Sequence, residues 1–197
     1  MRVRPVIVRV MPRYLALLRG VNVGGKKLAM ADLRDVAEQL GYTGVSTYIQ
    51  SGNLLFSSAA SDQAGLAGEL EREIAGRLGV QCDVVVLTGA DLNRVIADNP
   101  FPDEPNPRAL HAVLHQDQVG PDGQAQLATA LDRAIAKGCE DEAAAAGRAV
   151  YLRTPNGIGR SELAVQLARV RKTGTARNWA TVTKLMEMLE TAPPGGE

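Results

Sequence analysis

Apolar residues in the first half of the chain follow two periods, one typical of strands and one typical of helices. Compact apolar runs predict strands over residues 14–19, 46–49, 54–57 and 83–87. Apolar positions three or four residues apart predict helices over residues 30–40, 64–78 and 90–98. The resulting order of strand, helix, two strands, helix and strand is that of a ferredoxin-like split β-α-β unit.

The second half repeats this order more loosely. We expect strands over residues 110–115, 140–144 and 149–153, and helices over residues 124–136, 161–171 and 175–189. The alanine run at 143–146 also suits a helix, so a helix is the alternative to the expected strand over residues 140–144. Thr175 is expected to cap the last helix, with Trp179 facing the core. The whole pattern predicts an α+β fold of two tandem ferredoxin-like subdomains with antiparallel or mixed sheets.

A proline-rich segment separates the two halves. Four prolines fall within residues 99–107, a composition that predicts a linker or an extended strap. The expected organisation is a disordered extension at 1–10, a first subdomain at 11–98, a linker at 99–108, a second subdomain at 109–191 and a disordered tail at 192–197.

Length and composition are those of an ordinary globular protein, since 45% of the 197 residues are hydrophobic and 22% are charged. No apolar run is long enough to cross a bilayer, and the first ten residues lack the apolar centre of a signal peptide, so we expect a cytoplasmic location. Cys82 and Cys139 lie far apart and outside any C-x-x-C spacing, which indicates neither a disulfide framework nor a zinc site.

The two histidines, His111 and His115, lie four residues apart on one expected strand and would share a face. They suit either a shared metal ion or two partly exposed strand positions. Because no carboxylate or thiolate lies at ligand spacing from them, we predict no metal site and no cofactor.

The formal net charge is zero, but the charges are distributed unevenly. Residues 1–31 carry seven basic side chains and no acidic one, whereas residues 32–147 carry seven basic and 18 acidic side chains. Residues 148–197 are basic again, with eight basic and four acidic side chains. If the fold brings the two basic ends together, they form a positive pocket for an anion or a nucleic-acid backbone. Otherwise the blocks neutralise one another across the fold.

A glycine-rich basic turn follows the first expected strand. Gly20, Gly25 and Lys26 reproduce the phosphate-loop spacing G-x-x-x-x-G-K, but Lys27 stands where a Ser or Thr would hold magnesium. The next helix begins near Met30 rather than at the lysine, so its amide groups would not face a phosphate held by the turn. The turn suits an anion-binding loop without hydrolysis, or a tight turn with solvated lysines, better than a working triphosphatase.

These observations favour a binding module for an anionic ligand, namely a phosphorylated small molecule, a nucleotide or a nucleic acid, in a basic cleft between the subdomains. The cleft would lie between the glycine-rich turn, the hairpin at 50–53 and the start of the last expected helix. The candidate ligand-binding residues are Arg19, Asn22, Gly24, Gly25, Lys26, Lys27, Gln50, Ser51, Asn53, Arg177 and Asn178.

Two other functions stay open on the same residues. One is an enzyme of phosphoryl or nucleotidyl transfer that uses the same pocket, although no catalytic residue stands out. The other is a structural or interaction protein in which the motifs only hold turns and contacts between subdomains. The sequence predicts no membrane contact and identifies no protein partner.

Three motifs resemble those of one known family. They are residues 19–26 with the helix start at Met30, residues 48–56 with the sequence Tyr-Ile-Gln-Ser-Gly-Asn-Leu-Leu-Phe, and residues 175–185 around Arg-Asn-Trp. In this order they resemble the bacterial family catalogued as domain of unknown function 1697, over nearly the whole chain from Met11 to about Leu189. The resemblance implies a cytoplasmic α+β protein with a duplicated ferredoxin-like arrangement, and it implies no particular activity, cofactor or partner.

Overall fold

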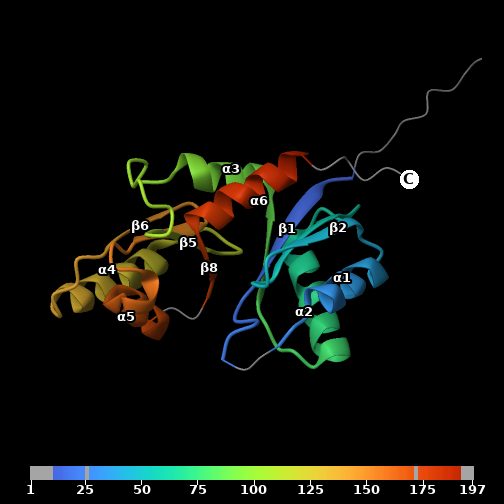
Figure 1. The fold of residues 1–197 in the computed structure, drawn as a ribbon, viewed down its shortest axis with the longest axis horizontal. Helices are drawn as coiled ribbons and strands as arrows, with labels where there is room; N and C mark the ends of the chain where they lie inside the picture. Colours follow the sequence, from blue (N-terminus) through green and yellow to red (C-terminus); the bar gives the residue numbers. More distant parts are fainter. Residues whose placement is uncertain (1–10, 25–26, 171–172, 192–197) are drawn as a thin grey trace, which may run out of the picture.

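The structure is a computed structural model that describes residues 11–24, 27–170 and 173–191 (Figure 1). In the first half, four strands form a sheet in the order β2-β3-β1-β4. The elements of this half are β1 (Arg13–Leu18), α1 (Met30–Gln39), β2 (Thr43–Tyr48), β3 (Asn53–Ser57), α2 (Gln63–Leu78), β4 (Val84–Thr88) and α3 (Gly89–Ala97).

The second half has the same chain order, and its sheet has the equivalent strand order β6-β7-β5-β8. Its elements are β5 (Leu110–Leu114), α4 (Pro121–Ile135), β6 (Glu142–Ala146), β7 (Ala149–Arg153), the 3-10 turn η1 (Ile158–Arg160), α5 (Glu162–Val170), β8 (Thr175–Asn178) and α6 (Trp179–Thr191). All paired strands run antiparallel. The predicted α+β fold with two similar ferredoxin-like subdomains is therefore confirmed.

Three apolar cores hold the layers together. The helices α1 and α2 pack on the outer face of the first sheet, and α4 and α5 pack on the outer face of the second (Figure 1). The helices α3 and α6 share a central core with the inner faces of both sheets. In β1, Leu15 and Leu17 enter the central core, whereas Tyr14, Ala16 and Leu18 enter the outer one. One continuous apolar run supplies both cores because successive strand residues point to opposite faces.

The structure corrects the expected last helix. Residues Thr175–Asn178 form β8, which pairs with β5 and completes the second sheet, so α6 begins only at Trp179. The side-chain oxygen of Asn178 accepts a hydrogen bond from the Thr181 backbone N–H at 2.8 Å, so Asn178 caps the helix in place of Thr175. A strand this short has too few positions to show a period, and its partner lies far earlier in the chain.

The alanine run at 143–146 is part of β6 and pairs with β7, which selects the strand from the two alternatives. The helix α4 begins before the expected residue 124, at Pro121, because proline suits a first helical turn, where its missing N–H would have no partner.

The subdomain bounds stay a prediction, and the termini at 1–10 and 192–197 lie outside the described residues. Within the described ranges, no helix is both long and apolar enough to cross a bilayer.

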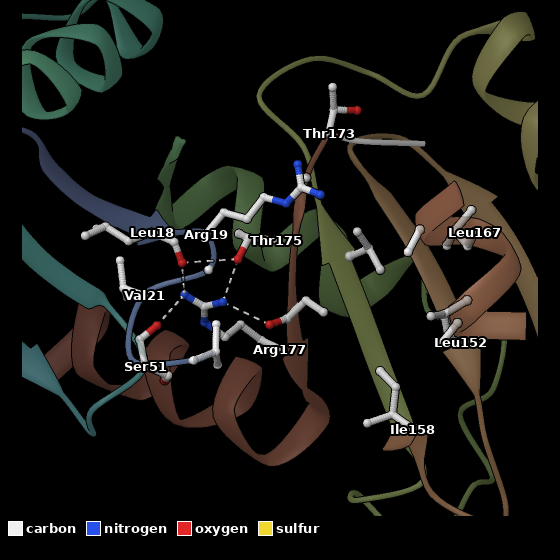
Figure 2. Close-up of a pocket in the computed structure, with 17 residues that line it drawn as sticks. Leu18, Arg19, Val21, Ser51, Leu152, Ile158, Leu167, Thr173, Thr175 and Arg177 are labelled. Atoms are coloured by element: carbon white, nitrogen blue, oxygen red, sulfur yellow. Dashed lines mark hydrogen bonds between the residues drawn. The ribbon is translucent and has the colours of Figure 1, made fainter. Parts of the chain in front are cut away.

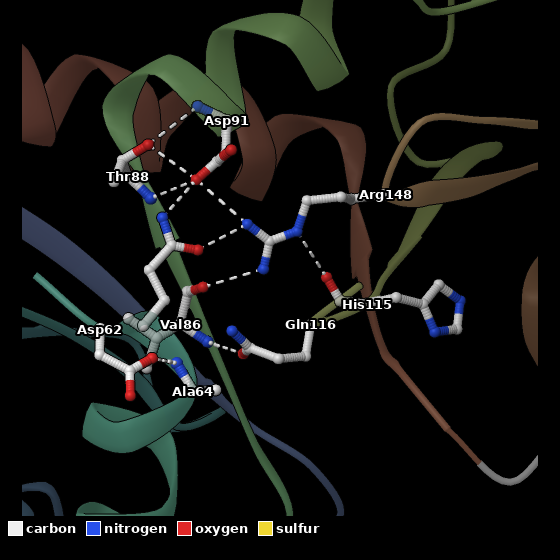
Figure 3. A network of polar contacts seen from close by, with 9 residues as sticks. Asp62, Ala64, Val86, Thr88, Asp91, His115, Gln116 and Arg148 are labelled. Carbon is white, nitrogen blue, oxygen red and sulfur yellow. Dashed lines mark hydrogen bonds and ion pairs between the residues drawn. The ribbon is translucent and has the colours of Figure 1, made fainter. Parts of the chain in front are cut away.

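Arg148, in the turn between β6 and β7, connects the second half to β4 at the edge of the first sheet (Figure 3). Its guanidinium donates to the Val86 carbonyl at 3.1 Å and to the Gln63 side-chain oxygen at 2.7 Å. It also pairs with Asp91 at 3.1 Å. The Val86 N–H donates to the Gln116 side-chain oxygen at 2.9 Å. Side chains of the second half therefore satisfy backbone groups that an edge strand would leave open.

Both histidines are buried, which corrects the alternative of partly exposed positions. His111 on β5 is 8% exposed, and His115, just beyond it, is 3% exposed. In the described part of the chain, the Nδ1 atom of His111 has no hydrogen-bond partner, and no group of three or more His, Cys, Asp or Glu side chains is arranged to hold a metal ion. Burial disfavours the charged ring, so the pKa of His111 is lower than its usual value.

We expect the free energy of unfolding to decrease as the pH falls below about 6.5, with a contribution from His111. The unfolded chain binds a proton near the usual pKa, whereas the folded protein keeps the ring neutral to lower pH. The stabilisation is complete above the unfolded pKa and is lost as the pH falls through the lowered one. Urea unfolding at about pH 8 and about pH 5.5 measures how much stability each protein loses between the two pH values. The loss should be smaller for His111→Gln than for the unsubstituted chain. An equal loss in both proteins would contradict this assignment.

Candidate functional site

Three segments that are far apart in the sequence meet at one side of the interface between the halves. The end of β1 contacts the β2–β3 hairpin, because the Leu18 N–H donates to the Gly52 carbonyl at 2.8 Å. The loop after β1 contacts the same hairpin, because the Asn22 amide donates to the Gln50 carbonyl at 2.8 Å. The strand β8 joins them through Arg177, which donates to the Leu18 carbonyl at 3.0 Å. The structure thus brings together the three segments predicted to surround a cleft.

The loop after β1 is a turn held by its own side chain. Gly20 and Gly24 have positive φ angles of 67° and 59°, which glycine adopts without strain. Asn22 also has a positive φ, of 55°. Its amide nitrogen donates to the Leu28 carbonyl at 2.9 Å, and its amide oxygen accepts from the Leu28 N–H at 2.8 Å. The Asn22 side chain therefore serves the loop itself.

The β2–β3 hairpin requires a glycine at its base. Gly52 has a φ of 70°, and a Cβ there would lie 2.6 Å from the Val21 side chain and 2.7 Å from that of Leu18. Asn53 is fully buried, and its amide nitrogen donates to the Ser51 hydroxyl at 2.9 Å. The close packing of Gly52 against β1 brings the hairpin carbonyls within reach of β8.

Arg177 is the polar centre of this site (Figure 2). It lies on β8, is only 7% exposed, and donates hydrogen bonds to both halves of the molecule. Its acceptors are Asn53 Oδ1 (2.6 Å), Thr175 Oγ1 (2.6 Å) and the carbonyls of Ala176 (2.9 Å), Leu18 (3.0 Å), Ser51 (2.9 Å) and Gly52 (3.2 Å). A guanidinium has five N–H groups, and these contacts occupy all of them.

The charge of Arg177 has no counter-ion among the described residues. All of its acceptors are neutral, and none of the ion pairs found in the described ranges includes it. Burial lowers the pKa of Arg177 to about 10, so the guanidinium stays charged at neutral pH. The site therefore holds a buried positive charge that hydrogen bonds satisfy but that no acidic side chain of the described residues compensates.

A cavity of about 400 Å³ lies beside Arg177, between the two halves (Figure 2). The first half lines it with the end of β1, the following loop and Ser51. The second half lines it with mostly apolar side chains, among them Leu152, Ile158 and Leu167. The described lining of the cleft is thus largely apolar and contains two cations, Arg177 and Arg19.

Arg19 is bound more loosely than Arg177. Its side chain is 34% exposed and lies 3.3 Å from the carboxylate of Asp83, which is itself 74% exposed. Within the described ranges, this pair is the only side-chain hydrogen bond of Arg19. Exposed ion pairs of this kind are weak, so most N–H groups of Arg19 stay available beside the cavity.

The remaining candidate residues lie apart from the cavity lining or outside the described residues. Gln50 and Lys27 are exposed, and Asn178 caps α6. Gly25 and Lys26 lie in the part of the chain that the structure does not describe. Sequence reasoning missed the apolar wall from β7 and α5, because its residues follow the spacing of ordinary core positions.

The β2–β3 hairpin also contains a strained residue. Ile49 has a φ of 48°, although its β-branched side chain disfavours positive φ, and it is 51% exposed. Burial therefore gives little compensation for the strain. The hairpin is held in this conformation by its neighbours, which include the Asn22 and Arg177 contacts described above.

The sequence profile of the family described as Protein of unknown function (DUF1697) matches residues 11–151, so the chain belongs to this family, as its motifs predicted. A solved structure, that of conserved bacterial protein SP0830 from Streptococcus pneumoniae, is similar, with 26% sequence identity and a TM-score of 0.68. The similarity covers 91% of this chain and 99% of that chain. None of the curated proteins compared with the chain matches it. Function therefore has to be argued from the site.

We expect Arg177→Met to lower the free energy of unfolding by about 3 kcal/mol, because it leaves buried acceptors of both halves without donors. Arg177→Lys should be intermediate, since it keeps the charge but has fewer donors. Arg108→Met, at an exposed position, is the control and should change stability by less than about 0.5 kcal/mol. Denaturant unfolding measures all three, and a similar effect at both arginines would show that the buried contacts contribute little.

We expect Ile49→Asn to raise the free energy of unfolding by about 1 kcal/mol, because asparagine tolerates a positive φ better than a β-branched residue. Thr47→Asn, in the preceding strand β2, is a control that should lower stability, since asparagine is unfavourable in strands. A loss of stability in Ile49→Asn, measured by thermal unfolding, would show that the isoleucine contributes more by contact than it costs in strain.

Proposed function

We propose that this member of the DUF1697 family binds a small anionic molecule in the cleft between its two halves. The observation that carries the proposal is the Arg177 guanidinium, a buried cation that lines the cavity and whose acceptors among the described residues are all neutral. An anion in the cavity would compensate this charge, and burial of the guanidinium strengthens the Coulomb attraction between them. The charge of Arg177 therefore favours an anion over a neutral or cationic ligand.

The two arginines would act in different ways. Arg177 has no N–H group to spare, so it contributes its charge and holds the walls of the cleft in place. Arg19 has N–H groups available and a weakly held partner, so it can donate directly to the anion. The anion would compete with Asp83 for Arg19.

The lining favours a small molecule over a nucleic acid. No described residue that lines the cavity is aromatic, whereas proteins that bind single strands stack the bases on aromatic rings. A cavity of about 400 Å³ has the size of a small-ligand pocket. Nucleic-acid binding, group transfer and a purely structural role are the alternatives that the experiment distinguishes.

The test measures the melting temperature of the full chain with acetate, octanoate, inorganic phosphate, AMP with and without magnesium, and a short single-stranded RNA. We expect a saturable rise with at least one small anion. Arg19→Gln should weaken binding about tenfold, because a charge-assisted hydrogen bond is lost. Arg108→Gln removes an exposed charge that does not line the cavity and should bind as the unsubstituted chain does.

A second variant tests the competition at Arg19. Asp83→Asn should strengthen anion binding severalfold, whereas Asp103→Asn, an equal change of charge at another exposed position, should not. Stabilisation by RNA alone would favour nucleic-acid binding, and release of inorganic phosphate from AMP, with water as the acceptor, would favour a transfer enzyme. No stabilisation by any probe would refute the binding proposal and favour a structural role.

A further inference from the structure

The cavity has two chemically different sides (Figure 2). One side carries the two cations, Arg19 and Arg177, and lies against the first half and β8. The opposite side is hydrocarbon from Leu152, Ile158 and Leu167, which β7, η1 and α5 supply. A ligand that fills the cavity therefore meets positive charge at one end and an apolar wall at the other.

A compact hydrophilic anion matches only the cationic side. Phosphate or acetate would leave the apolar wall in contact with water, which is unfavourable in proportion to the apolar area that stays exposed. A ligand with a hydrocarbon body would displace that water and pack against the wall. The lining thus selects for an amphipathic ligand.

The cationic side suits a single negative charge. All N–H groups of Arg177 are occupied by protein acceptors, and Arg19 is shared with Asp83. A diphosphate or triphosphate brings several charges, whereas the described lining offers only two cations, of which Arg19 is already paired with Asp83. A carboxylate brings one charge, and its two oxygens match the two parallel N–H groups of one guanidinium.

We infer that the ligand of this cleft is a small monocarboxylate with an apolar body. Its carboxylate contacts Arg19 within the field of Arg177, and its hydrocarbon body lies against Leu152, Ile158 and Leu167. This inference rests on the proposed function of anion binding and narrows it to one chemical class.

The test is a chain-length series of acetate, butanoate, hexanoate and octanoate, measured by isothermal titration calorimetry with the full chain. Affinity should rise by about fourfold for each methylene that the apolar wall covers, and then level off. Octanol should bind at least tenfold more weakly than octanoate, because it lacks the charge that the arginines recognise.

A larger side chain in the cavity tests where the hydrocarbon body of the ligand lies. Ala164 on α5 lines the cavity, so a leucine there would occupy part of the space for the hydrocarbon body. Ala164→Leu should therefore lower the affinity for octanoate at least tenfold, leave the affinity for acetate unchanged, and shift the preference to a shorter carboxylate. Ala128→Leu on the exposed face of α4 makes the same change away from the cavity and should leave the whole series unaltered.

The outcomes separate this inference from the proposed function. If phosphate or acetate binds as tightly as octanoate, the inference is wrong and anion binding in the cleft still stands. If octanol binds as tightly as octanoate, or no anion binds, both are wrong. If affinity grows with the length of the carboxylate but is unaffected by Ala164→Leu, the hydrocarbon body lies elsewhere and the inference is overturned.

Discussion

A buried guanidinium has to find an acceptor for every N–H group, and this constraint at Arg177 organises the interface between the halves. Four of its six acceptors belong to the first half, namely the backbone carbonyls of Leu18, Ser51 and Gly52 and the side chain of Asn53. The arginine itself lies on β8 of the second half. The β2–β3 hairpin and the end of β1 can therefore occupy only those positions in which their oxygens face β8.

A second arginine does the equivalent work at the other edge strand. Arg148 reaches from the β6–β7 turn to the Val86 carbonyl on β4, whereas Arg177 reaches from β8 to the β2–β3 hairpin. In each case the hairpin of one half meets the edge strand of the other, as expected when two units of the same topology pack face to face. The difference is electrostatic, since Arg148 pairs with Asp91, whereas Arg177 pairs with no acidic side chain in the described ranges. Among the described residues, only the Arg177 side keeps an uncompensated charge beside a cavity, which is why the proposed site lies there.

The candidate site was foreseen in part, and for identifiable reasons. Glycine signals placed Gly20, Gly24 and Gly52 in turns, and all three adopt positive φ angles. Reasoning from polarity then treated Asn22 and Asn53 as ligand contacts, whereas their amides bond the protein itself. An amide beside a turn has the same sequence signature in both roles. The apolar wall gave no signal, because a leucine that lines a cavity and a leucine in a core share one pattern.

The sequence alone determined the alternation of strands and helices, the duplication and the family, because periodicity and turn chemistry are local properties. Tertiary structure decided what depends on long-range pairing. It made Thr175–Asn178 a strand by supplying β5 as a partner, and it made Arg177 a buried link between the halves. It also decided which apolar residues line a cavity, since a cavity exists only where two packed surfaces fail to meet.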